Sequence, residues 1–265
     1  TGRYEEVMQL CEELPKLHPR RLKALRFGTT PEQRSMLALV ASGGGHLTAE
    51  AARQSGLPVL YLQGCIHPGE SDGKDAGFWF IQDLLTGVLD KTLLDKMIIL
   101  FVPILNIDGH ERFAAYNRPN QNGPDEMGWR VTAQNLNLNR DYTKIESPEM
   151  AASLRLLNSF DPLVFADMHA TDGAEFEHDL SIMVDPSDQG LEPMKGAGLE
   201  LRQKLFAKLE RQGHTPVSFY PTLNAEDDPA SGFNLTLLSP RYSNGYWGAR
   251  RSEEHTSELQ SHSFI

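Results

Sequence analysis

The sequence has few cysteines, a shortage of positive charge and no long apolar run, and each shortage excludes a class of protein. Cys11 and Cys65 are the two cysteines in 265 residues, too few for a disulfide-stabilised scaffold. No apolar stretch reaches the roughly 20 residues that a transmembrane helix needs. The 25 lysines and arginines face 36 aspartates and glutamates, and a formal net charge of −11 argues against nucleic-acid binding. With 40% hydrophobic residues, the chain fits one domain with a substantial core.

Alternating strand and helix patterns in the first half of the chain indicate an α/β fold. Residues 59–64 (VLYLQG) have the pattern of a buried strand, and residues 96–106 form a second continuous apolar run. Between them, Phe80, Leu84 and Val88 recur at helical spacing, so we expect a helix with these residues on its apolar face. A strand–helix–strand unit places its two strands parallel in one sheet.

Three further elements are predicted from local signals. Residues 20–41 have the pattern of a β-hairpin that turns at residues 29–32. Ser147 followed by Pro148 is typical of the start of a helix, with the serine as N-cap. Residues 191–212 predict a helix with four leucines toward the core: Leu199, Leu201, Leu205 and Leu209.

A His-Pro-Gly-Glu tetrapeptide, residues 67–70, follows the first predicted strand directly, and His169 ends another apolar run, residues 162–169. Two imidazoles and one carboxylate make a three-ligand zinc site whose fourth position stays open for water, as in zinc hydrolases. Loops at the carboxyl ends of strands are also where α/β sheets bind ligands. An H-x-x-E motif can arise by chance in a chain with nine histidines, so its position after a strand carries the argument.

A long segment between these motifs, residues 106–135, is rich in Asn, Pro, Gly and charge. Long loops in compact domains are usually functional. Trp129-Arg130 lies near its end, and Asn139-Arg140 follows it. Arginine suits the planar, bidentate recognition of a carboxylate. Without a zinc site nearby, both arginines would be interpreted as ordinary surface residues.

Taken in order, five features resemble the zinc metallocarboxypeptidases of peptidase family M14, in a bacterial-type form. They are the HxxE motif, the segment VPILNIDGHERF (residues 102–113), the Trp-Arg pair, the Asn-Arg pair and the distant histidine. The resemblance runs from about Arg26 to about Arg250. It implies an α/β fold with a mixed, mostly parallel central sheet and helices on both faces.

The resemblance also implies a role for each catalytic motif. His67, Glu70 and His169 would bind one Zn²⁺ ion, and such an ion lowers the pKa of a water molecule for attack on an amide bond. Arg130 would polarise the scissile carbonyl group and stabilise the oxyanion.

Substrate binding is implied for two pairs of residues. Asn139 and Arg140 would hold the terminal carboxylate, while Tyr242 and Tyr246 lie in the region where the family carries a substrate-capping tyrosine. We therefore expect a zinc-dependent carboxypeptidase that cuts the amide bond next to the C-terminal carboxylate of a peptide or amino-acid conjugate.

The sequence departs from the family pattern around the metal ligands. Asn137 stands where many members have an aspartate that orients the first zinc histidine, and an amide carries no charge. Asp167 is a second candidate for this support, because residues i and i+2 of a strand share a face and its carboxylate would lie beside His169. A solvated or structurally paired aspartate is the alternative. Cys65 is expected to be a small packed residue rather than a fourth ligand.

The last fifteen residues, 251–265 (RSEEHTSELQSHSFI), resemble the conceptual translation of a short-read sequencing adapter. We therefore expect a catalytic domain over residues 1–250, truncated near its C-terminus with the last strand or strands missing, and a disordered artefact over residues 251–265. In the family, a glutamate on a strand beyond this point is the general base. Asp172, Glu175 and Glu177 have the pattern of loop carboxylates, so low hydrolytic activity is expected of this chain.

Two other functions stay open from the sequence. Zinc deacylases of small acyl-amino acids share HxxE and a distant histidine, although residues 117–126 and the two arginine pairs favour a peptidase. A zinc-binding module that holds peptides without turnover is favoured if the parent gene also lacks the glutamate. None of these functions needs a membrane span or a nucleic-acid partner, and a signal peptide for a periplasmic or secreted location would precede Thr1.

Overall fold

The computed structural model forms two compact units, Thr1–Ala174 and Glu175–Ile265. It describes residues 2–119, 121, 124–170, 176–186, 191–225, 228–234, 239–251 and 263–264. Asp172 and Glu175 fall outside these ranges.

A sheet forms the core of the first unit, with strand order β1-β2-β4-β3-β7 among the described residues. The strands are β1 (Leu22–Thr29), β2 (Ser35–Ala41), β3 (Val59–Gln63), β4 (Ile98–Val102) and β7 (Val164–Asp167). β2 is antiparallel to β1 and β4, while β3 is parallel to β4 and β7. Four strands therefore run in one direction and β2 runs against them, which confirms the predicted mixed, mostly parallel sheet.

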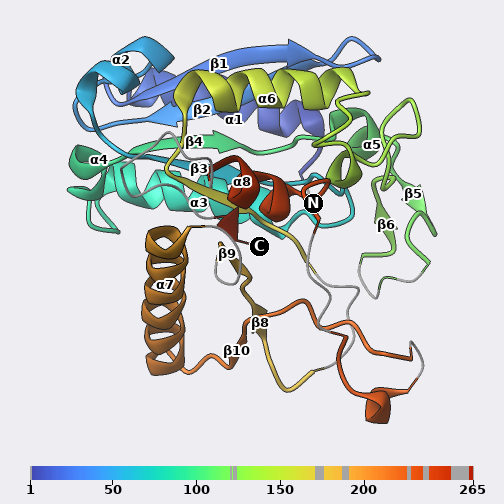
Figure 1. Cartoon of the computed structure of the whole chain (residues 1–265). Helices are drawn as coiled ribbons and strands as arrows, with labels where there is room; N and C mark the ends of the chain where they lie inside the picture. The colour runs from blue at the N-terminus through green and yellow to red at the C-terminus, as the bar shows by residue number, and fades with distance from the viewer. Residues whose placement is uncertain are drawn as a thin grey trace. The chain divides into compact units, whose positions relative to one another are not determined.

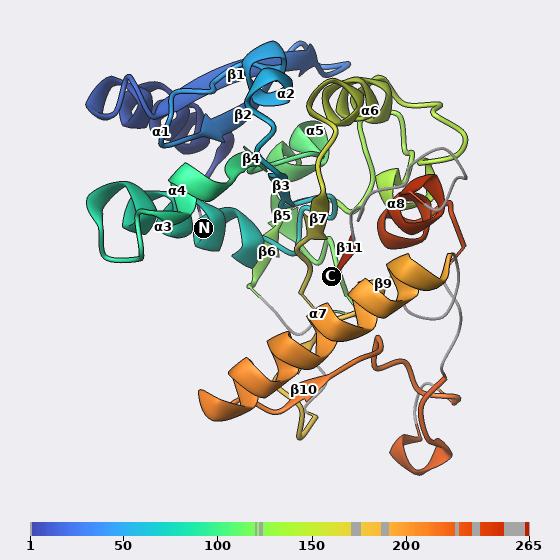
Figure 2. The same cartoon turned by 60° about the vertical axis from the view of Figure 1, so that its left-hand side comes forward.

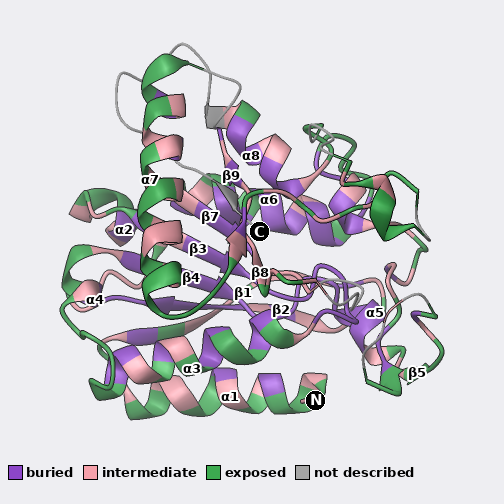
Figure 3. Ribbon diagram, turned by 90° about the horizontal axis from the view of Figure 1, so that it is seen from below, coloured by how far each residue is buried: buried purple, intermediate pink, exposed green. Residues whose placement is uncertain are grey.

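Helices cover both faces of this sheet. Figures 2 and 3 show α1 and α3 on one face and α6 on the other (Figure 1 gives the labels). All five residues of β4 are buried, as expected for a strand covered on both sides. The helical elements of the unit are α1 (Tyr4–Leu17), α2 (Ala49–Ser55), α3 (Asp72–Thr86), α4 (Leu93–Lys96), α5 (Ile107–Glu111), η1 (Leu138–Arg140) and α6 (Pro148–Phe160).

The predicted start of α6 is confirmed. The hydroxyl of Ser147 accepts a hydrogen bond from the backbone N–H of Met150, 3.1 Å away, and Pro148 is the first helical residue. The carboxylate of Asp141 accepts hydrogen bonds from the N–H and the hydroxyl of Ser147, at 2.9 and 2.7 Å. The N-cap is therefore itself held in place by the residue that follows the Asn-Arg pair.

The predicted apolar face of α3 is right at Leu84, which is buried, and wrong at Val88, while Phe80 is half-buried. Val88 lies beyond the helix, because Gly87 ends it in a left-handed conformation (φ 86°), and Val88 is exposed. The face that packs on the sheet includes Gly73 and Gly77, where an added Cβ would lie 2.4 Å from the Cβ of Met168 and 2.3 Å from the ring of Phe101. This helix therefore packs both through close backbone approach at the two glycines and through its buried large side chains, Phe78, Ile81, Leu84 and Leu85.

The second unit combines one 20-residue helix, α7 (Glu192–Arg211), with shorter elements. The shorter elements are β8 (Leu180–Ser181), β9 (Val184–Asp185), β10 (Pro216–Val217), η2 (Pro229–Ser231), α8 (Ser243–Arg251) and β11 (Ser263–Phe264). β8 and β10 are parallel, and β9 and β11 are antiparallel. α7 matches the predicted helix, but its four predicted core leucines are only half-buried, while Met194 and Gly198 are buried. Residues 252–262 lie outside the described part, so the disorder expected of residues 251–265 stays a prediction.

Among the helices in the described ranges, none is long and apolar enough to cross a membrane.

The start of the chain is attached to the end of α5 through Glu111. Its carboxylate accepts hydrogen bonds from the Arg3 guanidinium at 3.1 Å and from the N–H of Tyr4 at 3.1 Å, and it lies 2.9 Å from Nδ1 of His110. Burial alone would raise the pKa of Glu111, but these hydrogen bonds outweigh it and lower that pKa to about 2. The ionised carboxylate therefore stabilises the folded state.

The lowered pKa of Glu111 predicts that Glu111→Gln reduces the stability of the folded state in a pH-dependent way. Since the folded pKa lies below the unfolded value, the stabilisation is full above about pH 5 and is lost as the pH falls toward 2. We expect the variant to be destabilised by about 2 kcal/mol at pH 7, with the difference from wild type shrinking between pH 5 and pH 2. Urea unfolding at several pH values measures this difference. A difference independent of pH would contradict the assigned ion pair.

Candidate metal centre

The His-Pro-Gly-Glu loop is shaped by the end of β3. Gly64 follows the strand where an added Cβ would lie 2.8 Å from the carbonyl oxygen of Pro103, so only glycine fits this close approach. The N–H of Glu70 then donates to the carbonyl of His67 at 2.9 Å, closing a turn with Pro68 at its second position. The turn brings the two side chains to the same side, and both are buried, with 2% and 4% of their surfaces exposed.

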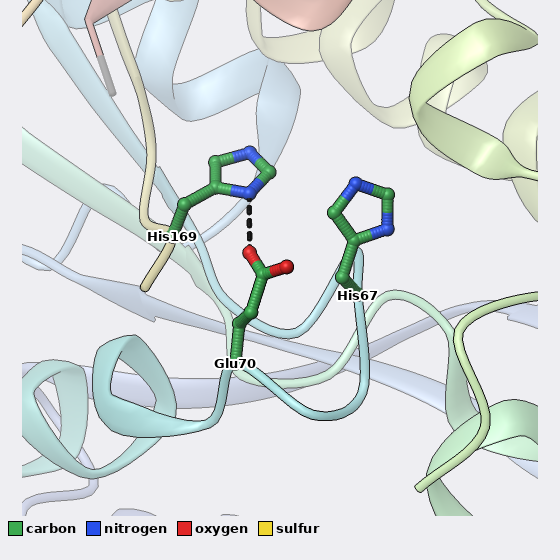
Figure 4. Close-up of side chains that lie close together, drawn as sticks. All are labelled: His67, Glu70 and His169. Carbon is green, nitrogen blue, oxygen red and sulfur yellow. Dashed lines mark hydrogen bonds and ion pairs between the residues drawn. The ribbon is translucent and has the colours of Figure 1, made fainter. Parts of the chain in front are cut away.

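His169 reaches the same place from the next strand. It follows β7, which pairs with β3 in parallel, so the two strands end at the same edge of the sheet. One nitrogen of His67, one nitrogen of His169 and one carboxylate oxygen of Glu70 all lie within 4.8 Å of one another. Figure 4 shows the Glu70 carboxylate extending toward His169, with His67 beside it. In the described ranges this is the one group of three such side chains able to hold a metal ion.

The protonation chemistry of His67 suits a metal ligand. Burial lowers its pKa well below the usual value, and the nearby positive charges of His169 and Arg130 add to this effect. Its Nδ1 is buried and has no hydrogen-bond partner among the described residues. A neutral imidazole is the form in which histidine binds zinc.

His169 and Glu70 form a tight ion pair. Nδ1 of His169 lies 2.7 Å from Oε2 of Glu70, and its Nε2 lies 3.0 Å from Oδ2 of Asp167. Burial alone would lower the pKa of His169, but the two carboxylates outweigh it and raise that pKa to about 10. The carboxylate of Glu70 thus holds a positive charge at the point where a cation would bind. The two nitrogen and one oxygen donors fit Zn²⁺.

The predicted catalytic arginine lies against this group. Nη2 of Arg130 is 3.1 Å from Nε2 of His67, and its Nη1 is 3.4 Å from Oε1 of Glu70. Its side chain is 37% exposed, so the guanidinium faces both the metal ligands and solvent. Asn106 donates to the backbone carbonyl of Arg130 at 3.3 Å and so helps to fix this part of the loop.

Of the predicted substrate-binding and supporting residues, Arg140 and Asp167 lie near the metal ligands, whereas Asn137 does not support His67. The charge of Arg140 is close enough to lower the pKa of His67, and its Nη1 donates to the carbonyl of the buried Asn139 at 2.6 Å. Asp167 lies beside His169 as the strand alternation predicts. Asn137 instead accepts the N–H of Asn139 at 3.1 Å, and no hydrogen bond from it to His67 is formed among the described residues.

Three other predicted residues lie outside the group. Cys65 is buried, with its Sγ 3.8 Å from the carbonyl oxygen of Glu70, and it is not one of the grouped ligands. The packed role expected for Cys65 is therefore confirmed. Tyr242 and Tyr246 belong to the second unit, directly before α8 and within it, so their contact with substrate stays a prediction.

Two residues of the site were not singled out from the sequence. Arg118, whose side chain is 3% exposed, donates to Oε1 of Glu70 at 2.9 Å. Gln63, fully buried at the end of β3, donates to Oδ1 of Asp167 at 2.9 Å. A polar residue inside an apolar strand was the available signal for Gln63. Arg118 lies in the polar loop, where no pattern separates it from surface arginines.

Comparisons with known proteins show the family and the fold of the chain. The family model described as zinc carboxypeptidase, peptidase family M14, matches residues 7–176, more than half of the chain. No curated protein matches. Among solved structures, a metallo-carboxypeptidase from Burkholderia cenocepacia is similar, with a TM-score of 0.65 and 17% identity over 98% of this chain and 59% of that one. Carboxypeptidase A from Helicoverpa armigera has a TM-score of 0.67 and 18% identity over 99% of this chain and 63% of that one.

Bovine thrombin-activatable fibrinolysis inhibitor, solved in complex with tick carboxypeptidase inhibitor, has a TM-score of 0.65 and 15% identity, covering 99% of this chain and 85% of that chain. These likenesses concern the fold. The chain spans about three fifths of the length of the first two structures.

Proposed function

Since the chain belongs to the zinc carboxypeptidase family, we propose that it forms part of an enzyme that hydrolyses the peptide bond next to a C-terminal carboxylate. The observation that carries the proposal is the convergence of His67, Glu70 and His169 within 4.8 Å, with Arg130 against them. Two nitrogens and one oxygen from three side chains leave room in a tetrahedral shell for water or substrate. When bound, a zinc ion supplies a Lewis acid and lowers the pKa of a water molecule.

We assign to Arg130 the stabilisation of the negative charge that develops on the substrate carbonyl oxygen. Its guanidinium lies within hydrogen-bonding distance of both His67 and Glu70, and it is partly exposed. A substrate carbonyl oxygen beside the metal ligands would therefore meet a fixed cation. Donors placed in advance at a developing oxyanion stabilise the transition state without reorganisation.

Asn139 and Arg140 are assigned to the substrate carboxylate. Asn139 is 6% exposed and its backbone carbonyl accepts a hydrogen bond from the Arg140 guanidinium, so the Arg140 side chain is anchored to the backbone of η1 beside Asn139. A guanidinium makes shorter and stronger hydrogen bonds to a carboxylate than to a neutral amide. Holding the terminal carboxylate would place the last peptide bond of the substrate at a fixed distance from the metal ligands.

Tyr242 and Tyr246 are candidates for closing over the substrate, and low hydrolytic activity of the 265-residue chain remains a prediction. Glu70 and Asp167 are already engaged with His169, so neither is free to act as a general base. Glu177 is exposed in the second unit. A test of function on this chain therefore needs a binding measurement beside the cleavage assay.

The test is a substrate panel on the zinc-loaded chain. It compares N-blocked peptides with a free C-terminal carboxylate, the same peptides as C-terminal amides, and small acyl-amino acids. Calorimetry measures binding, and release of the C-terminal amino acid measures cleavage. We expect the peptide acids to bind at least tenfold more tightly than the amides, because a charge-assisted bidentate contact is worth roughly 1.5–3 kcal/mol.

The same panel decides between the alternatives. Preference for acyl-amino acids over peptides would favour a deacylase instead. Equal binding of acids and amides would contradict recognition of the C-terminus. His67→Ala serves as the control for signals that do not depend on the metal.

A further inference from the structure

A buried polar network lies directly behind His169, and Gln63 is at its centre. Gln63 is the last residue of β3, and the parallel register pairs it with Asp167 at the end of β7. Both side chains are buried, with 0% and 1% of their surfaces exposed. A polar pair in the core of a sheet is costly unless it is hydrogen-bonded, so the bonds that it makes define its role.

The hydrogen bonds of Gln63 fix the orientation of its amide. Its Nε2 donates to Oδ1 of Asp167 at 2.9 Å and to the hydroxyl of Tyr142 at 3.3 Å. Its Oε1 accepts from the hydroxyl of Tyr61 at 2.9 Å. If the amide were turned around, a carbonyl oxygen would face the Asp167 carboxylate. The network therefore presents an N–H donor, and not an acceptor, to Asp167.

Asp167 connects Gln63 to the imidazole of His169. One of its oxygens is held by Gln63, and the other lies 3.0 Å from Nε2 of His169. The opposite ring nitrogen, Nδ1, is 2.7 Å from Glu70 and faces the candidate metal site. A histidine ligand needs its proton on the nitrogen away from the metal, and a carboxylate at that nitrogen fixes both the tautomer and the ring.

We propose that Gln63 is a positioning residue for zinc binding, which acts through Asp167 to hold His169 with its Nδ1 directed to the metal. The inference rests on the proposed function, because it concerns the zinc site of that function. It goes beyond that function by adding a residue whose side-chain hydrogen bonds go to Tyr61, Tyr142 and Asp167 and not to a metal ligand. It also explains why β3 ends in an amide within an otherwise apolar strand.

The test is a double-mutant cycle on zinc affinity in the 265-residue chain. Gln63→Met removes the amide but keeps an unbranched side chain of similar size, and Asp167→Asn removes the charge that Gln63 orients. Competition with a chromophoric chelator gives the Kd for Zn²⁺ of wild type, both single variants and the double variant. Supporting groups behind metal ligands typically contribute about 10- to 100-fold in metal affinity.

We expect Gln63→Met to weaken zinc binding about tenfold and the double variant to bind within about twofold of Asp167→Asn alone. Such non-additivity shows that the amide acts through the aspartate, whereas a general loss of packing would weaken both backgrounds equally. Tyr142→Phe is the matched control, since it removes a partner of the amide but leaves the bond to Asp167, and its Kd should stay within about twofold of wild type.

Two results would overturn the inference: an unchanged Kd in Gln63→Met, or losses in the single variants that multiply in the double variant. If Gln63→Met fails to fold, Gln63→Glu replaces it, because it keeps the shape and exchanges the donor for a second carboxylate beside Asp167. It should bind zinc about tenfold more weakly than wild type at pH 8. Wild-type protein that binds zinc no better than His67→Ala would instead remove the proposed function itself.

Discussion

Zinc content should fall from about one equivalent in the wild-type chain to near zero in His67→Ala and in His169→Ala. Each change removes one of three protein ligands, and the remaining two donors no longer make a site that competes with buffer and water. Because groups behind the ligands already contribute about 10- to 100-fold, loss of a ligand should weaken zinc binding by roughly 100-fold or more. Elemental analysis after dialysis against zinc, with chelator competition for the Kd, measures both quantities.

A matched histidine controls for unspecific metal binding. His46 lies in the first unit but outside the grouped ligands, so His46→Ala should keep the wild-type zinc content. Circular dichroism of each variant distinguishes loss of the site from loss of the fold. Unchanged zinc content in both His67→Ala and His169→Ala would show that the metal, if bound, is held elsewhere.

Replacing Arg140 by alanine should weaken the binding of a peptide acid far more than that of the matching peptide amide. The guanidinium is expected to form a charge-assisted, bidentate contact with the terminal carboxylate, and loss of one partner costs roughly 2 kcal/mol or more, or about 30-fold in Kd. The amide lacks the charge, so its binding should change little. Calorimetry with the zinc-loaded chain measures both ligands without requiring turnover.

The prediction is tested by whether Arg140→Ala weakens binding of the acid more than binding of the amide. Arg155 is an exposed arginine on α6, so Arg155→Ala removes the same net charge at a distance and should affect neither ligand. Equal losses of acid and amide binding in Arg140→Ala would show that this arginine supports the site generally and does not recognise the terminus.

Much of the fold follows from local patterns in the sequence. The run of apolar residues at 59–62 and the serine-proline pair at 147–148 are strong signals, and both elements form where they predict. The predicted face of α3 is only partly right, because Leu84 is buried but Val88 lies beyond the helix and is exposed. Gly73 and Gly77 add close backbone contacts to that face, and a pattern of large apolar residues does not register them.

The three metal ligands could also be predicted from the sequence, but the residues that support them could not. His67, Glu70 and His169 follow strands, and strand ends converge in a parallel sheet, so their meeting needs no knowledge of distances. The supporting contacts depend on tertiary structure. The side chain of Asn137 accepts a hydrogen bond from the backbone N–H of Asn139, and Arg118 donates to Glu70 from a distant loop. The spacing of residues in the sequence predicts neither contact.

We expect one zinc ion to be held by His67, Glu70 and His169, and X-ray absorption at the zinc edge identifies its neighbours directly. The chain loaded with one equivalent should show only nitrogen and oxygen neighbours at about 2.0–2.2 Å, with the outer-shell signal of two imidazoles, and this signal should be lost in His169→Ala. A sulfur neighbour at about 2.3 Å, or an imidazole signal that persists unchanged in His169→Ala, would contradict it.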